Sequence, residues 1–139
     1  MKVIGIEIAG RKIQIVALDK TESGIKDSTG SYKPIVLQED EIAKNVQHFR
    51  DTIFATLDSF SPDVIVIKYR NPKGKGMMAP SPISFKIEGL IQTYKKCPIL
   101  FTKPQTIAAY FKKNELPFKP KYTYQSEALK LAVHYIHTN

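Results

Sequence analysis

The run Val64-Ile65-Val66-Ile67-Lys68-Tyr69 decides the fold of this chain. Four β-branched apolar residues in succession are typical of a parallel strand that is buried on both faces at the centre of a sheet. Ser61-Pro62-Asp63 separates this run from the segment before it, because proline cannot continue a helix. Parallel neighbours require crossover connections, so the run predicts an α/β protein with helices on both faces of a mixed sheet.

The residues before this run predict three antiparallel strands and one helix. Residues 2–9 and 12–19 alternate in part between apolar and polar side chains, which predicts two strands. Residues 21–30 are polar and predict a loop or a wide hairpin, and residues 31–37 predict a third, short strand. Apolar residues then recur every three or four positions, which predicts an amphipathic helix over residues 40–59 with acids in its first turn.

The residues after the run predict alternating helices and strands. Residues 70–82 hold three prolines and two glycines and predict a long loop. Helices are expected over residues 84–96, 103–113 and 124–137, with a strand over residues 98–101. The order β-β-β-α-β-α-β-α is that of a ribonuclease H-like fold, a five-stranded mixed sheet with helices on both faces. Periodicity alone also permits other α/β layouts.

Composition narrows the class of protein. The length of 139 residues predicts one domain, residues 1–139, and the 42% apolar and 24% charged content is that of an ordinary globular protein. The single cysteine, Cys97, excludes an internal disulfide and favours a reducing compartment. No apolar run approaches the ~20 residues of a membrane span, and Glu7 and Arg11 interrupt the first apolar stretch. We therefore expect a cytoplasmic protein without a membrane partner.

The positive charge lies in the second half of the chain. Residues 1–62 hold 8 Lys or Arg against 9 Asp or Glu, whereas residues 63–139 hold 13 against 4. A one-sided basic surface attracts polyanions, so the pattern predicts DNA or RNA as a partner, with simple solubility as the alternative. Two groups of residues are the candidate nucleic-acid contacts: Lys68, Tyr69, Arg70, Lys73 and Lys75, and then Lys112, Lys113, Lys119 and Lys121.

A second aromatic stretch accompanies the later lysines. Phe118, Tyr122 and Tyr124 alternate with Lys119 and Lys121. A nucleic-acid surface is one interpretation, because exposed rings stack on bases. The favoured interpretation is that at least two of the three rings anchor the loop to the core.

Several segments, taken in order, resemble a known family. Ile4-Gly5-Ile6-Glu7 is similar to its opening strand and residues 62–68 to its fourth strand. Residues 84–90, 101–107 and 127–133 fall at its crossover helix, its fifth strand and its last helix. The chain therefore resembles the RuvC-type Holliday junction resolvases of the ribonuclease H-like superfamily, and also a related group of small uncharacterised bacterial proteins.

The resemblance implies phosphodiester hydrolysis with Mg²⁺ or Mn²⁺ held by carboxylates, and a homodimer as in the resolvases. By position, Glu7 matches the acid of the opening strand, and Glu127 matches the second acid of the last helix. Lys68 stands where a glutamate is expected, and Tyr124 stands where an aspartate is expected. An ammonium repels a cation, so Lys68 is expected to pair with Glu7 as a structural remnant or a phosphate clamp.

Three hypotheses follow. The first is a nucleic-acid-binding protein with an eroded metal site, catalytically weak or inactive. The second is an active Mg²⁺- or Mn²⁺-dependent endonuclease, specific for junctions or other structures, in which Glu7 and Glu127 are the catalytic and metal-binding residues. The third is a protein-interaction or regulatory domain that uses the basic face on an acidic partner.

Overall fold

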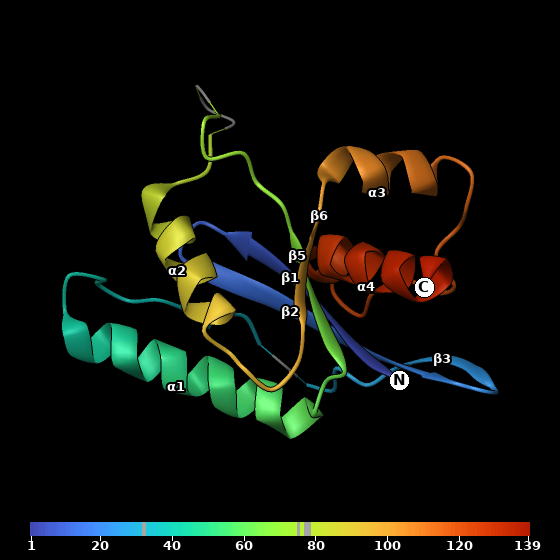
Figure 1. The fold of residues 1–139 in the computed structure, drawn as a ribbon, viewed down its shortest axis with the longest axis horizontal. Coiled ribbons are helices and arrows are strands. Elements are labelled where there is room, and N and C mark those ends of the chain that lie inside the picture. Colours follow the sequence, from blue (N-terminus) through green and yellow to red (C-terminus); the bar gives the residue numbers. More distant parts are fainter. Residues whose placement is uncertain (32, 75, 77–78) are drawn as a thin grey trace.

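The computed structural model describes residues 1–31, 33–74, 76 and 79–139. Lys75, one of the candidate nucleic-acid contacts, lies outside the described residues. The elements follow one another along the chain as Figure 1 shows: β1 (Lys2–Ala9), β2 (Lys12–Thr21), β3 (Gly24–Asp27), β4 (Ile35–Val36), α1 (Ala43–Phe60), β5 (Val64–Lys68), α2 (Pro82–Gln92), β6 (Ile99–Thr102), α3 (Pro104–Phe111), the 3-10 helix η2 (Thr123–Gln125) and α4 (Ser126–Thr138).

The strands form one mixed sheet in the order β3-β2-β1-β5-β6. β1 and β2 are antiparallel, whereas β5 runs parallel to β1 on one side and to β6 on the other. Helices α1 and α2 cover one face of the sheet, and α3 and α4 cover the other (Figure 1). The α/β fold class and the central place of the apolar run are therefore confirmed.

The third strand differs from the prediction. Residues 24–27 form β3, a hairpin partner of β2, so of the two alternatives for residues 21–30 the hairpin is the one observed. Among the described residues of the strand expected over 31–37, Ile35–Val36 form the strand β4. Both short strands pair with the outer edge of β2, which is ten residues long and has room for each. Pro34 directly precedes β4 and lacks an N–H for the ladder, which limits that strand.

The first helix begins later than predicted. α1 starts at Ala43, so the acids at positions 39–41 precede the helix instead of occupying its first turn. Asp40 forms ion pairs with Lys86 of α2 at 3.0 Å and with Arg11 at 3.6 Å. The hydrogen bond from Lys86 lowers the pKa of the Asp40 carboxyl. Asp40 therefore serves tertiary contacts and not the helix dipole.

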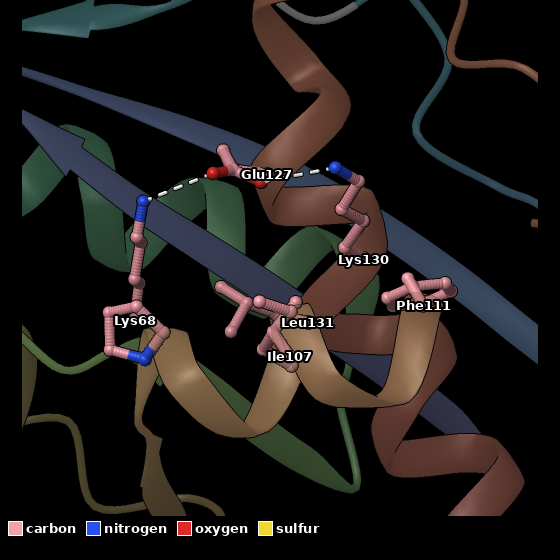
Figure 2. Close-up of a pocket in the computed structure, with 8 residues that line it drawn as sticks. Lys68, Ile107, Phe111, Glu127, Lys130 and Leu131 are labelled. Carbon is pink, nitrogen blue, oxygen red and sulfur yellow. Dashed lines mark hydrogen bonds and ion pairs between the residues drawn. The ribbon is translucent and has the colours of Figure 1, made fainter. Parts of the chain in front are cut away.

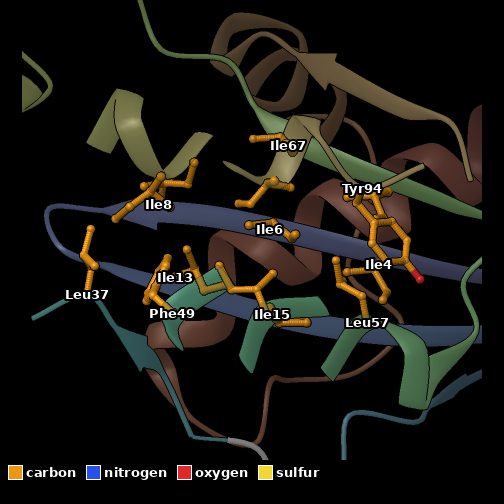
Figure 3. Packing of buried hydrophobic residues seen from close by; sticks show 14 of the residues in the cluster. Ile4, Ile6, Ile8, Ile13, Ile15, Leu37, Phe49, Leu57, Ile67 and Tyr94 are labelled. Carbon is orange, nitrogen blue, oxygen red and sulfur yellow. The ribbon is translucent and has the colours of Figure 1, made fainter. Parts of the chain in front are cut away.

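Alternation along the strands produces two hydrophobic cores. Ile4, Ile6 and Ile8 face α1 and α2, together with Ile13 and Ile15 of β2 (Figure 3). Every second residue of β1 points to the opposite face, where α4 packs against the sheet. Glu7 therefore belongs to the α3–α4 side. None of the helices that the structure describes is long and apolar enough to span a membrane.

Helix α4 approaches β1 very closely at Gly5. A Cβ atom at this position would meet the backbone carbonyl oxygen of Ala128 and lie 3.2 Å from the backbone nitrogen of Ala132. These neighbours are backbone atoms of α4, so there is no flexible side chain that could move away. Glycine at this position therefore allows α4 to lie directly on β1, and this contact places the amino end of α4 beside the end of the strand.

Substitution of Gly5 tests this contact. Gly5→Ala is expected to lower the free energy of unfolding by about 1–3 kcal/mol, because overpacking against backbone forces the helix away from the strand. Urea unfolding followed by circular dichroism measures the change. The matched control is Gly89→Ala in α2, where no described atom lies within 4 Å of the added Cβ and a gain of about 0.5–1 kcal/mol is expected. Equal stability of Gly5→Ala and the wild type would contradict the close approach.

Candidate functional site

The parallel register brings the ends of two central strands together. Ile6 pairs with Ile67 at the last step of the β1–β5 ladder, so Glu7 and Lys68 are the next residues on each strand. Lys68 lies on the same face of β5 as Val64 and Val66, the face that packs against α4. The amino end of α4 adds Glu127 to the same place.

Lys68 lies between two carboxylates. Its Nζ donates to Oε1 of Glu127 at 3.2 Å, and it lies 3.7 Å from Oε2 of Glu7. Lys130, one turn further along α4, places its Nζ 3.8 Å from Oε2 of Glu127 (Figure 2). The expected pairing of Lys68 with Glu7 is therefore present, and Glu127 joins it.

Glu7, Lys68, Glu127 and Lys130 form a charge cluster that is partly shielded from solvent. The side chains of Glu7 and Lys68 are 21% and 25% exposed. Burial raises the pKa of the Glu7 carboxyl, Lys68 lowers it, and the nearby charge of Glu127 raises it. When Glu7, Glu127, Lys68 and Lys130 are all ionised, their charges cancel. The cluster therefore has no excess negative charge to attract a divalent cation.

The residues present do not fit the metal site that the resemblance implies. Magnesium and manganese ions take about six oxygen ligands, mainly from several carboxylates and water. Within the described part of the chain, no group of three or more His, Cys, Asp or Glu side chains could hold a metal ion. The ammonium of Lys68 occupies the space between Glu7 and Glu127 and would repel an ion there.

Other acids do not complete the cluster. Glu88 of α2 pairs with Arg70 at 3.2 Å, and Asp63 accepts a hydrogen bond from the backbone N–H of Lys2. Tyr124, at the position where the family has an aspartate, is exposed and stacks on Tyr122. These side chains are engaged elsewhere.

A groove of about 600 Å³ opens beside the cluster, at the carboxyl ends of β5 and β6. Open α/β sheets bind ligands at this end of their parallel strands. The groove is lined by Lys68, Tyr69, Arg70, Asn71, Gly74, Pro80, Lys103, Pro104 and Gln105. A smaller cavity of about 100 Å³ lies next to it, between α3 and α4, and shares Lys68 and Pro104 with it (Figure 2). Lys68 therefore belongs both to the charge cluster and to the groove.

The predicted contacts after β5 have different surroundings. Tyr69 and Lys73 are exposed. Arg70 is only 11% exposed: its guanidinium donates to Glu88 and to the backbone oxygen of Ser84, and it lies over the ring of Phe85. Arg70 therefore ties the loop to α2 through Nη2 of its guanidinium, and the same side chain lines the groove.

Sequence reasoning missed one charged residue among those that line the groove. Lys103 directly follows β6 and precedes Pro104, the first residue of α3. Its place could have been inferred, because the carboxyl ends of parallel strands meet at one edge of a sheet. The prediction concentrated on runs of lysines, and Lys103 stands alone in the sequence.

The second group of predicted lysines lies apart from the groove. Lys112 and Lys113 are exposed and follow the carboxyl end of α3, whose amino end borders the groove. Gln105 and Lys112 are seven positions apart along the helix, which amounts to about 10 Å. Lys119 and Lys121 are exposed in the segment that precedes η2. The structure therefore divides the predicted contacts between two places.

The favoured interpretation of the second aromatic stretch is wrong. Phe118 packs against the α3–α4 core as expected. Tyr122 and Tyr124 are both exposed and therefore do not anchor the core. Their neighbours at positions 125, 128 and 129 already fill the space beneath the start of α4.

Solved structures share this fold. RuvC from Thermus thermophilus superposes with a TM-score of 0.75 at 12% identity, covering 99% of this chain and 96% of that chain. The same protein in complex with a Holliday junction substrate gives 0.74 at 12% identity, over 100% and 97%. The fowlpox virus Holliday junction resolvase gives 0.60 at 12% identity, over 100% of each chain. At such identities the likeness shows the fold, and it confirms the resolvase-like arrangement expected from the sequence.

Sequence comparison assigns the chain to a family. No curated protein matches it. A family model described as "Protein of unknown function (DUF3010)" matches residues 1–135, which is nearly the whole chain. The chain therefore belongs to the DUF3010 family.

Proposed function

We propose that this protein binds nucleic acid through the groove at the carboxyl ends of β5 and β6, with the ammonium of Lys68 in the place of a metal ion. The observation that carries the proposal is the position of Lys68. Its Nζ lies within 4 Å of both Glu7 and Glu127, and the same side chain lines the groove. The cation that a resolvase-like site requires is thus supplied by the chain itself.

The charge balance around the groove supports this proposal. Two uncompensated carboxylates at its edge would repel a phosphodiester backbone, and Lys68 and Lys130 compensate them. Lys103 lines the groove and, within the described residues, forms no ion pair. The exposed Lys73 follows on the loop. The net field in the groove therefore favours an anionic backbone.

The lining also offers groups that recognise nucleotides. Asn71 and Gln105 carry amides that donate to and accept from phosphate, sugar or base edges. Tyr69 is exposed at the rim and presents a ring for stacking. One structural relative is in complex with a Holliday junction substrate, which is consistent with a nucleic-acid ligand. The homodimer suggested by the resemblance stays a prediction.

Salt dependence tests the binding directly. The wild-type protein is expected to bind DNA or RNA in the presence of EDTA, with an affinity that falls steeply as salt rises. Lys103→Ala is expected to weaken binding and to reduce the slope of log K against log salt by about one. The control is Lys95→Ala, an exposed lysine at the opposite, amino end of β6, which leaves binding unchanged.

Three outcomes of fluorescence-polarisation and cleavage assays would contradict the proposal. The first is no binding to DNA or RNA at low salt. The second is cleavage of branched or linear substrates with Mg²⁺ or Mn²⁺ that Glu7→Ala abolishes, which would establish the endonuclease. The third is tight binding to a protein partner without affinity for polyanions.

Removal of the ammonium is expected to change the titration of Glu7. Lys68 lowers the pKa of the Glu7 carboxyl, whereas burial and Glu127 raise it. Lys68→Met therefore raises this pKa above its wild-type value, which a carboxyl NMR titration measures.

The same substitution predicts a pH dependence of stability. A carboxyl whose pKa is higher in the folded chain than in the unfolded chain contributes stability while protonated, and loses it as pH rises through the folded value. The free energy of unfolding of Lys68→Met should therefore fall further below that of the wild type as pH rises and Glu7 ionises. Adding Glu7→Gln to Lys68→Met should remove this pH-dependent loss of stability. An unchanged or lower pKa of Glu7 in Lys68→Met would contradict the assigned contact.

A change of charge at Lys68 tests the metal argument. Lys68→Glu places a third carboxylate between Glu7 and Glu127, and this variant is expected to bind Mn²⁺, unlike the wild type. Isothermal titration measures the binding, and a rise in Tm with added Mn²⁺ gives an independent reading. Lys68→Gln, which has a similar size and no charge, is the control and should gain less affinity for Mn²⁺. No binding by a folded Lys68→Glu variant would count against the geometry.

A further inference from the structure

A stacked pair of tyrosines lies outside the groove, at the amino end of α4. The rings of Tyr122 and Tyr124 are 5.3 Å apart between centroids and only 5° from parallel. They are 42% and 39% exposed, so the pair presents a flat aromatic surface to solvent. The proposed groove does not use either residue.

Buried contacts fix the backbone that carries the two rings. Gln125 is 2% exposed, and its backbone N–H donates to the carbonyl of Tyr122. Its side-chain oxygen accepts from the N–H of Tyr122 at 3.3 Å. This reciprocal pair closes the turn of η2, with Tyr124 at its centre. The surface is therefore organised before any ligand arrives, which reduces the entropy that binding must remove.

The charge beside the rings selects the kind of ligand. The ammonium of Lys121 lies over the ring of Tyr122, 5.5 Å from its centroid. Lys119 is exposed two residues earlier, and no acid occurs between Glu115 and Glu127. Lysines beside exposed aromatic rings suit a ligand that has a π face and an adjacent anion, which describes a nucleotide.

We infer that Tyr122 and Tyr124 form a stacking platform for an unpaired nucleobase, with Lys121 beside its phosphate. This inference rests on the proposed nucleic-acid binding and names its substrate class: strands that contain unpaired bases. Lys121 already lies over Tyr122, so the added base extends the stack on Tyr124. A base inside a duplex has both faces covered and cannot occupy this position.

The platform lies near the charge cluster along the chain. Tyr124 lies three positions before Glu127, whose carboxylate accepts from Lys68. At the rise of a 3-10 turn, this separation is about 6 Å along the axis. The same short segment therefore carries the two tyrosines and the Glu127 carboxylate of the charge cluster beside the groove.

Abasic oligonucleotides test the platform. The wild type is expected to bind a short oligothymidylate more tightly than an abasic strand of equal length, because only the former can stack. Tyr124→Ala should weaken oligothymidylate binding about 5-fold or more, and leave affinity for the abasic strand and for a blunt duplex unchanged. Tyr124→Phe retains the ring and should restore binding. Lys121→Ala should weaken binding of both single strands.

Intrinsic fluorescence gives a second reading. The chain has seven tyrosines and no tryptophan, so tyrosine emission is not masked. Quenching by oligothymidylate should be smaller in Tyr124→Ala than in the wild type or in Tyr124→Phe. If Tyr124→Ala binds and quenches like the wild type, the platform is excluded while nucleic-acid binding stands. If the wild type binds none of the three probes, the proposed function fails, and the platform fails with it.

Discussion

Direct backbone contact between α4 and β1 at Gly5 sets the arrangement of the charged groups. The contact leaves no room for a side chain, so the amino end of α4 lies beside the carboxyl end of the strand. Two carboxylates, Glu7 and Glu127, are thereby brought to one partly buried place. Like charges at such a place destabilise the fold unless a cation lies between them. The backbone packing thus creates a requirement, and the ammonium of Lys68 meets it.

A lysine meets this requirement differently from a metal ion. It carries one charge instead of two, and it is covalently part of β5, so its occupancy does not depend on the concentration of any ion. It donates up to three hydrogen bonds but does not activate a water molecule as a divalent ion does. Under the proposed function, the groove would therefore hold an anionic backbone with a lysine ammonium in the place of a divalent ion, and binding would not depend on metal.

The sequence predicted the parts of the fold that depend on local pattern. The β-branched run at positions 64–67 became the central strand, and parallel register then implied that Lys68 meets Glu7. The short strands on the edge of β2 were located only in part, because their pairing is decided by the length of β2 and not by their own residues. Arg70 stays a predicted phosphate contact, and the sequence does not show that Glu88 and Phe85 on the next helix also engage it. Lys103 was missed because it lies in the groove through topology alone.

The two proposed surfaces, the groove and the tyrosine pair, would differ in how much each discriminates among nucleic acids. In the proposal, lysines in the groove interact with phosphates, which every nucleic acid has, so they would supply affinity that salt weakens and that sequence barely changes. The tyrosine pair would interact with a base, which is accessible only where the partner strand is missing or displaced. Contact with both surfaces at once is therefore possible only for a ligand that joins a phosphate backbone to an unpaired base. In this proposal Tyr124, which stands where the resemblance predicts an aspartate, supplies an exposed ring that distinguishes an unpaired strand from a duplex.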